Sequence, residues 1–202
     1  MDQEALSRFF LGEILILFLL VRVFFTIASR VKGARKPEDV KTTVPEGKAN
    51  FILRRFVLVP ALSASFFFLY AHPSWMSLFS IPLHRLGIYL GAILGLCGLV
   101  LLTWVHLSLG KQWSAKLQLR NDHDLIQSGP YSRIRHPMYT ALFAVYLSLG
   151  IVSTNYVILI LIVAAVVSIA ARIPQEEEML IARFGEEYKK YQQSTGRLFP
   201  KL

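Results

Sequence analysis

The fold is decided by residues 129–178, which begin GPYSRIRHPMY (129–139) and end RIPQEEE (172–178). Between these two polar segments, residues 138–171 contain no Lys, Arg, Asp or Glu. An apolar run of this length, with a polar break near its middle at 153–155, is typical of two short helices in a membrane. The sequence therefore predicts a helical hairpin that leaves a basic segment and returns to an Arg–Glu cluster at the same membrane surface.

The composition of the whole chain agrees with a membrane protein. Of its 202 residues, 54% are hydrophobic and 17% are charged, and the mean hydropathy is +0.47. Three more apolar runs precede the hairpin, at about 9–28, 51–70 and 86–109, each close to the ~20 residues that span a bilayer. We expect an all-α, polytopic membrane protein of five transmembrane helices, including the C-terminal helical hairpin. A charged tail with helical apolar spacing predicts one cytoplasmic amphipathic helix over 175–194.

Lys and Arg are unevenly distributed among the connections. Residues 29–50, 110–137 and the chain after 171 are rich in them, whereas 71–84 contain none. The positive-inside rule then predicts that the three basic segments are cytoplasmic and that the N-terminus lies outside. The net charge of +9 is explained by cytoplasmic loops near anionic lipid, so we expect no nucleic-acid partner.

Two features of the third apolar run bear on packing. Gly87, Gly91 and Gly95 recur every four residues and form a smooth stripe on one helix face. The stripe serves either the fold or a dimer, which leaves the oligomeric state open. Cys97 is the only cysteine, which excludes an internal disulfide, and we expect it to be a small buried side chain.

The two polar segments carry the candidate site. Tyr131, His136 and Tyr139 offer aromatic faces and hydrogen-bonding groups, and Arg172 and Glu176 share a helix face if the helix continues. Three consecutive carboxylates at 176–178 are costly beside lipid unless they face water, a cation or a ligand. An interfacial turn with a surface salt bridge is the alternative. Phosphate-binding glycine loops and HExxH are absent, and the histidines lack metal-ligand spacing, so we expect no metal.

Together these segments resemble the isoprenylcysteine carboxyl methyltransferase family, especially its compact prokaryotic members. The resemblance rests on GPYSRIRHPMY, the apolar hairpin, RIPQEEEMLIARFGEEYKKY (172–191) and GRLFP (196–200), and covers about residues 105–202. It implies a single integral membrane domain, 1–202, in which 105–202 form the cofactor-binding catalytic half and 1–84 a membrane scaffold. It also implies methyl transfer from S-adenosyl-L-methionine, at the membrane–cytosol interface, to a lipophilic small molecule or prenylated peptide, typically a prenylcysteine carboxylate.

The resemblance also assigns residues. The catalytic residues it implies are Arg172, near the methyl acceptor, and Glu176. The cofactor contacts it implies are His123, Asp124, Leu125, Ile126, Tyr131, His136, Pro137, Met138, Tyr139, Glu176 and Glu177. The chemistry fits these types, because a guanidinium can hold a carboxylate with two donors and aromatic faces suit a sulfonium cation.

Other functions remain open at this point. Membrane sterol reductases, which use NADPH, have a related C-terminal half with an RHPxY-like element. The carboxylates at 176–178 and the FGEEY segment (184–188) favour the methyltransferase. A non-catalytic lipid-binding scaffold is a further alternative, and methylation of a lipid amine is a variant of the main hypothesis.

Overall fold

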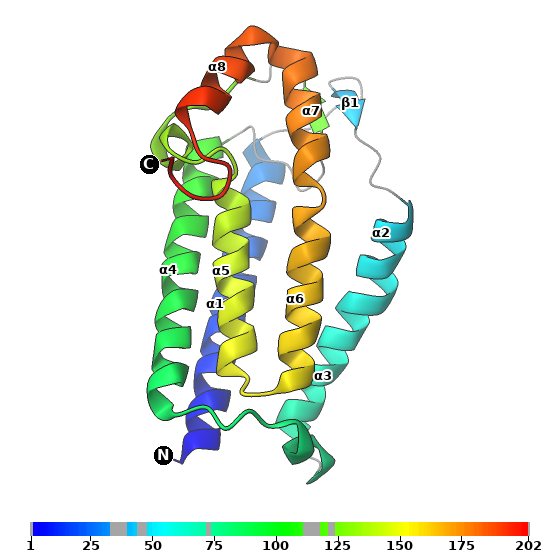
Figure 1. Cartoon of the computed structure of the whole chain (residues 1–202), viewed down its shortest axis with the longest axis vertical. Helices are drawn as coiled ribbons and strands as arrows, with labels where there is room; N and C mark the ends of the chain where they lie inside the picture. The colour runs from blue at the N-terminus through cyan, green and yellow to red at the C-terminus, as the bar shows by residue number, and fades with distance from the viewer. Residues whose placement is uncertain are drawn as a thin grey trace.

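The structure is a computed structural model, and it describes residues 2–32, 40–43, 48–71, 74–110, 118–120 and 124–201. Long helices stand side by side as a bundle, with two shorter helices at one end (Figure 1). In chain order the elements are α1 (Gln3–Lys32), β1 (Val40–Thr43), α2 (Lys48–Ile52), the π-helix η2 (Leu53–Leu58), α3 (Val59–Ala71), η3 (Ser74–Phe79), α4 (Arg85–Leu109), β2 (Gln118–Arg120), η5 (Gly129–Ser132), α5 (Pro137–Val152), α6 (Tyr156–Ala170), α7 (Ile173–Phe184) and α8 (Glu186–Ser194).

The helical membrane architecture predicted from the sequence is confirmed. Four stretches are long and apolar enough to cross a membrane, and α5 is a shorter apolar helix. These stretches are Gln3–Ala28, Ala49–Ala71, Arg85–Leu109 and Tyr156–Phe184. The described residues add one feature that the sequence did not predict, a short antiparallel ribbon in which β1 pairs with β2.

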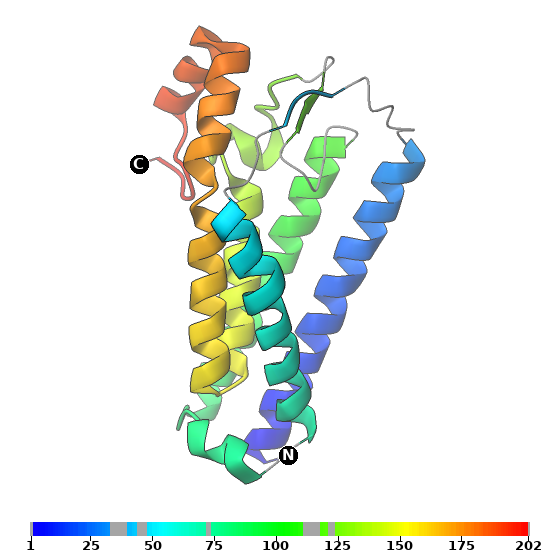
Figure 2. The same ribbon diagram turned by 90° about the vertical axis from the view of Figure 1, so that its right-hand side faces the viewer.

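The helices alternate in direction, so the connections gather at two ends. β1, β2, η5, α7 and α8 lie at one end, whereas the start of α1, η3 and the α5–α6 turn lie at the other (Figures 1 and 2). The described parts of the segments that the charge pattern assigns to the cytoplasm therefore share one end of the bundle. The orientation of that end in a membrane stays a prediction.

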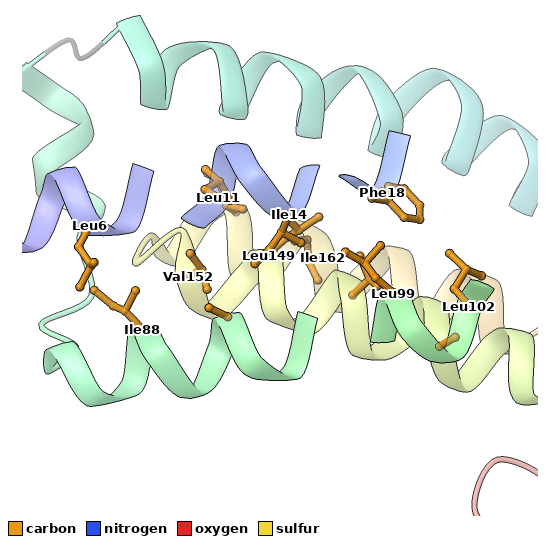
Figure 3. Packing of buried hydrophobic residues seen from close by; sticks show 14 residues of the cluster. Leu6, Leu11, Ile14, Phe18, Ile88, Leu99, Leu102, Leu149, Val152 and Ile162 are labelled. Carbon is orange, nitrogen blue, oxygen red and sulfur yellow. The ribbon is translucent and has the colours of Figure 1, made fainter. Parts of the chain in front are cut away.

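The hydrophobic core lies where α1, α4, α5 and α6 meet (Figure 3). Leu11, Ile14, Leu102 and Ile162 are almost completely buried there. The outer faces of the same helices are also apolar, as lipid requires. Cys97 lies on such an outer face, so the prediction that it is buried is wrong. Hydrophobicity cannot separate the core face from the lipid face when both are apolar.

In the glycine stripe of α4, Gly91 and Gly95 face α5, whereas Gly87 faces Leu83. A Cβ atom at Gly91 would press against Ile151, and one at Gly95 would press against Ser148. The Ser148 hydroxyl donates to the carbonyl oxygen of Gly91 (2.7 Å). The stripe therefore packs two helices of the same chain closely together, which supports the fold over the dimer as its purpose.

The second apolar run is interrupted by a wider helical turn. The N–H of Val59 donates to the carbonyl oxygen of Arg54, five residues back, as in a π-helix. Pro60 follows directly, and because it has no N–H and its ring crowds the preceding turn, the wider turn relieves the conflict. Arg54 is half-buried as a result, whereas Arg55 is exposed.

The tail is helical as predicted, but it forms two helices in place of one. Gly185 has φ +56°, a left-handed conformation that ends α7 and starts α8 in a new direction. Met179, Tyr188 and Tyr191 are buried, so the apolar side of the tail does face the rest of the protein.

Candidate active site

The segment before α5 is fixed by glycine and proline. Gly129 has φ +60°, and a Cβ atom there would press against Ser108 of α4. Pro130 is buried in the first turn of η5, and Pro137 begins α5 immediately after His136. These positions hold the segment against the end of α4 and set the direction in which His136 leaves the chain.

The C-terminal segment pairs with the same loop through its backbone. The N–H groups of Arg135 and His136 donate to the carbonyl oxygens of Gly196 (2.8 Å) and Arg197 (3.0 Å). The N–H of Gly196 in turn donates to the carbonyl oxygen of Arg133 (3.1 Å). The GRLFP segment thus acts as a short parallel partner strand for the RHPMY segment.

Two side-chain hydroxyls strengthen this attachment. The Tyr191 hydroxyl of α8 donates to the carbonyl oxygen of Tyr131 (2.6 Å). The Thr140 hydroxyl of α5 donates to the carbonyl oxygen of Leu198 (2.6 Å). The tail therefore sets the position of the loop on both sides of His136.

Glu177 joins the loop, the tail and α7 in one ion network. Its carboxylate accepts hydrogen bonds from Arg135 Nε (3.1 Å), His136 Nε2 (3.2 Å) and Arg197 Nη2 (2.5 Å). Arg135 also donates to two carbonyl oxygens at the end of α8. Nε2 of His136 faces this carboxylate, and a neutral ring that donates from Nε2 leaves Nδ1 as an acceptor.

Glu176 lies on the other side of the His136 ring. Its Oε2 atom is 3.9 Å from His136 Nδ1, too far for a hydrogen bond. This oxygen is buried and has no hydrogen-bond partner among the residues that the structure describes. Burial, and next the negative charge of Glu176, raise the pKa of the Tyr131 hydroxyl. The Tyr139 hydroxyl is also close to this carboxylate.

Arg172 stands one turn before Glu176, at the N-terminus of α7. The N–H of Glu176 donates to the carbonyl oxygen of Arg172 (3.1 Å), so the helix continues through Pro174, which occupies its first turn. The half-buried guanidinium of Arg172 is within electrostatic reach of the Tyr139 hydroxyl. The structure therefore brings Arg172, Glu176 and Tyr139 together.

The remaining predicted cofactor residues are less tightly connected to Glu176. His123 lies outside the described residues. Asp124 is exposed and Leu125 and Ile126 are half-buried in the segment that leads to η5, and all three stay predicted contacts. Pro137 is buried at the start of α5, and Met138 packs against the hydrophobic core.

Several residues of this site were not predicted from the sequence. They are Arg135 and Arg197, which bind Glu177, and Thr140 and Tyr191, which attach the loop to the tail. In the sequence, Arg135 is visible as part of RIRHP and Arg197 as part of GRLFP. Neither motif indicates that the partner is Glu177. The pairing of the tail with the loop is a tertiary contact over about 60 residues of sequence.

Glu176 Oε2, beside the His136 ring, is a hydrogen-bond acceptor without a partner among the described residues. In the neutral ring, His136 Nδ1 and Glu176 Oε2 are both acceptors, and a ligand hydroxyl or ammonium group placed between them would donate to them. A buried polar atom without a partner is costly, so the site fits a ligand that carries donors. Among the described residues, no group of three or more His, Cys, Asp or Glu side chains is placed to hold a metal ion.

The fold and this site define a class: a multi-pass membrane protein with a polar, charged site at one end of its helical bundle. The family model for the isoprenylcysteine carboxyl methyltransferase (ICMT) family matches residues 90–182, which include α5, α6 and the Arg–Glu cluster. The fold is similar to that of the eukaryotic intramembrane Ras methyltransferase ICMT. The TM-score is 0.55 and the identity 25%, over 78% of this chain and 54% of that chain. Residues 90–182 thus resemble the isoprenylcysteine carboxyl methyltransferase family in sequence, and the helical fold resembles that of a solved member.

Two curated relatives carry names from metal resistance. The nickel-cobalt-cadmium resistance protein NccN of Alcaligenes xylosoxydans xylosoxydans is 27% identical over 47% of this chain and 45% of its own length. The cobalt-zinc-cadmium resistance protein CzcN of Cupriavidus metallidurans is 26% identical over 76% of this chain and 67% of its own length. The chain thus spans about half the length of NccN and of the solved methyltransferase.

Proposed function

We propose that this protein transfers a methyl group from S-adenosyl-L-methionine to the carboxylate of a lipophilic acceptor, such as a prenylcysteine, at the membrane–cytosol interface. One observation carries the proposal: a buried Glu176 oxygen, which has no hydrogen-bond partner among the described residues, faces His136 one helical turn from Arg172. This cluster of acceptor atoms beside a cation lies at the polar end of an apolar bundle. The match of residues 90–182 to the methyltransferase family model supports it.

Glu176 and the aromatic side chains bind the cofactor in this proposal. The free Glu176 oxygen accepts from the ribose hydroxyls or the ammonium group, and Tyr131, His136 and Tyr139 supply aromatic contacts beside the positive charge. S-adenosyl-L-methionine, when bound, supplies a methyl group on a sulfonium that makes it reactive. The segment 123–126 and residues 137–138 complete the predicted contacts, together with the backbone that Glu177 holds in place.

Arg172 binds the acceptor. An ionised carboxylate is already a nucleophile at neutral pH, so no general base is required. The acceptor oxygen forms a bond to the methyl carbon while the carbon–sulfur bond breaks, its electron pair stays on sulfur, and no proton moves. A guanidinium that grips the carboxylate at two points aligns this displacement, which is the main requirement of the step.

The two halves of the chain have different roles in this proposal. Residues 105–202 form the catalytic half, residues 1–84 form a membrane scaffold, and the lipophilic acceptor reaches the site sideways from the bilayer. The end of the bundle that carries α7 and α8 faces the cytoplasm, where the cofactor is available. The family match favours this activity over the sterol-reductase-like alternative. A scaffold without catalysis would not explain why the buried Glu176 oxygen faces His136.

The direct test is methyl transfer by the purified protein. Labelled cofactor is supplied with farnesylated thiol acids, isoprenoid acids and phospholipid amines, and the product is separated and identified. We expect methyl esters of the carboxylates. Exclusive methylation of an amine, or reduction of a sterol with NADPH, would overturn the proposal.

Two substitutions separate the proposed roles. Arg172→Lys keeps the charge but loses the two-point grip, so turnover should fall about 30- to 1000-fold while affinity for S-adenosylhomocysteine is nearly unchanged. Glu176→Gln should weaken S-adenosylhomocysteine directly, as measured by calorimetry. The exposed neighbour Glu178→Gln is the matched control and should affect neither quantity. An equal loss of cofactor affinity in the first two variants would contradict the assignment.

A further inference from the structure

A second polar region lies at the end of the bundle opposite to the candidate active site. The start of α1, η3 and the α5–α6 turn come together there (Figures 1 and 2). With the end of α3 they line a cavity of about 350 Å³. The polar side chains of its lining come from separate parts of the chain and include Ser7, Arg8, Ser77, Ser80, Thr154 and Asn155. The 16 residues of α5 separate this cavity from the candidate active site by about 24 Å.

Contacts between these segments fix the shape of the cavity. The Ser7 hydroxyl of α1 donates to the carbonyl oxygen of Val152 (2.5 Å) at the end of α5. The N–H of Ile81 donates to the carbonyl oxygen of Thr154 (2.7 Å). Thr154 has φ +48°, a left-handed conformation that a β-branched residue rarely adopts. The surrounding contacts therefore hold this turn in a conformation that its own residue disfavours, as is common at binding sites.

Arg8 brings an unsatisfied donor to the cavity. Its Nη2 atom donates to Glu4 Oε1 (2.6 Å), one turn earlier on α1. The Tyr70 hydroxyl donates to the carbonyl oxygen of Arg8 (2.9 Å), which attaches α3 to this turn. The side chain of Arg8 is 27% exposed, but its Nε atom is buried and has no hydrogen-bond partner in the parts of the chain that the structure describes. A buried donor without a partner is costly, so Nε indicates a ligand that brings an acceptor.

The α5–α6 turn adds further donors. Asn155 is only 2% exposed, and its Oδ1 atom accepts from the N–H groups of Val157 (3.0 Å) and Ile158 (3.3 Å), which caps α6. The cap uses the side-chain oxygen and not the two amide donors of Nδ2. An amide and several hydroxyls around a guanidinium are donors that suit a phosphate group.

A more open cavity of about 550 Å³ shares Glu4 and Arg8 with the first. Asp2, Phe9 and Tyr70 also line it. Its carboxylates accept hydrogen bonds from an ammonium group, whereas the first cavity offers mainly donors. The Glu4–Arg8 ion pair therefore lies where a region that suits a cation meets a region that suits an anion.

Aromatic side chains place this end of the bundle at the level of lipid headgroups. Trp75 is 45% exposed, and its ring lies against Phe68 (5.3 Å between centroids) and Phe79 (6.5 Å). Tryptophan is typical of the membrane–water interface. Phe9, which lines the open cavity, is 52% exposed. A lipid headgroup in the two cavities would thus have apolar protein surface beside its acyl chains.

We propose that the two cavities form a binding site for the headgroup of one zwitterionic phospholipid, with its phosphate on Arg8 and its ammonium toward Asp2 and Glu4. The site goes beyond the proposed methyl transfer, which takes place at the other end of the bundle, and it does not depend on that activity. The bound lipid joins α1, η3 and the α5–α6 turn, and it stabilises the folded protein in proportion to its affinity.

The experiment measures lipid binding to the full chain in detergent by native mass spectrometry. The wild type should bind one dioleoylphosphatidylethanolamine more tightly than dioleoylphosphatidylglycerol, which lacks the ammonium, or dioleoylglycerol, which lacks the phosphate. Arg8→Gln should weaken binding of the first lipid about 10- to 100-fold. Ser80→Leu should also weaken it, because the larger side chain fills the first cavity while the Glu4–Arg8 pair stays intact. Arg85→Gln is the matched control, since Arg85 is exposed at the same end of the bundle, and it should equal the wild type.

Thermal unfolding without lipid shows whether each variant is folded, and Ser80→Leu decides the question if Arg8→Gln is not. Wild-type affinity for dioleoylphosphatidylethanolamine in the folded cavity variants would overturn the inference. Equal binding of dioleoylphosphatidylglycerol would remove the ammonium site, and equal binding of dioleoylglycerol would remove the phosphate site; either result overturns it. Free phosphoethanolamine should leave the Tm unchanged. A rise in Tm as large as the lipid produces would assign the site to a soluble phosphate and overturn the assignment to a lipid.

Discussion

Replacing Glu177 by Gln tests whether the ion network holds the active-site loop. The substitution keeps the size of the side chain and one acceptor oxygen, but it removes the negative charge. Three partners then lose a charge-assisted contact: Arg135, His136 and Arg197. Glu178 is the matched control, because it is the next residue of the same helix and is exposed.

The expected magnitude follows from burial. Removing one partner of a buried charge pair typically costs about 3–5 kcal/mol. The side chain of Glu177 is only 6% exposed, but that of Arg197 is 54% exposed, so water screens part of the network. We therefore expect Glu177→Gln to lower the free energy of unfolding by about 2–4 kcal/mol. For a chain of about 200 residues this corresponds to a fall in Tm of about 4–16 °C.

The assay is thermal unfolding in detergent micelles, followed by tryptophan fluorescence, with and without S-adenosylhomocysteine. Glu178→Gln should stay within about 0.5 kcal/mol of the wild type. Glu177→Gln should also bind S-adenosylhomocysteine more weakly, because an amide oxygen holds His136 Nε2 less firmly than the carboxylate does. A Tm equal to that of Glu178→Gln would refute the argument that Glu177 stabilises the loop.

Two further predictions concern the membrane bundle. Single cysteines at Ser77 and Ser194, in a Cys97→Ala background, should react with an impermeant reagent from opposite sides of the membrane, with Ser194 accessible from the cytoplasm; labelling from one side would contradict the topology. Gly95→Leu should lower the free energy of unfolding by about 1–3 kcal/mol, since its side chain would press against Ser148 of α5. Thermal unfolding measures this, with Leu96→Ile at the exposed neighbouring position as a control that stays near the wild type.

The sequence predicts the membrane helices well because their cause is local. Apolar runs must be helical in lipid, and polar residues such as Asn155 end them, so the boundaries of α5 and α6 fall within one residue of the prediction. The outward position of Cys97 was missed because lipid and core favour the same residue types. The boundary between α7 and α8 at Gly185 was missed because the apolar spacing continues across it, and spacing does not reveal a left-handed glycine.

The same distinction between local and tertiary causes applies to the candidate site. Arg172 and Glu176 could be placed on one helix face from their spacing, and the structure agrees. The roles of Arg135 and Arg197 could not be predicted, because they depend on the tail folding back onto the loop before α5.

The three consecutive carboxylates show what the fold adds to the sequence. Successive residues of a helix point about 100° apart, so three identical side chains enter three environments. Glu178 faces solvent, Glu177 is saturated by Arg135, His136 and Arg197, and Glu176 keeps a buried oxygen without a partner among the described residues. A saturated carboxylate has little capacity left for a ligand, whereas an unsaturated one beside His136 has that capacity. Glu177 is therefore suited to positioning the loop, and Glu176 to binding the cofactor.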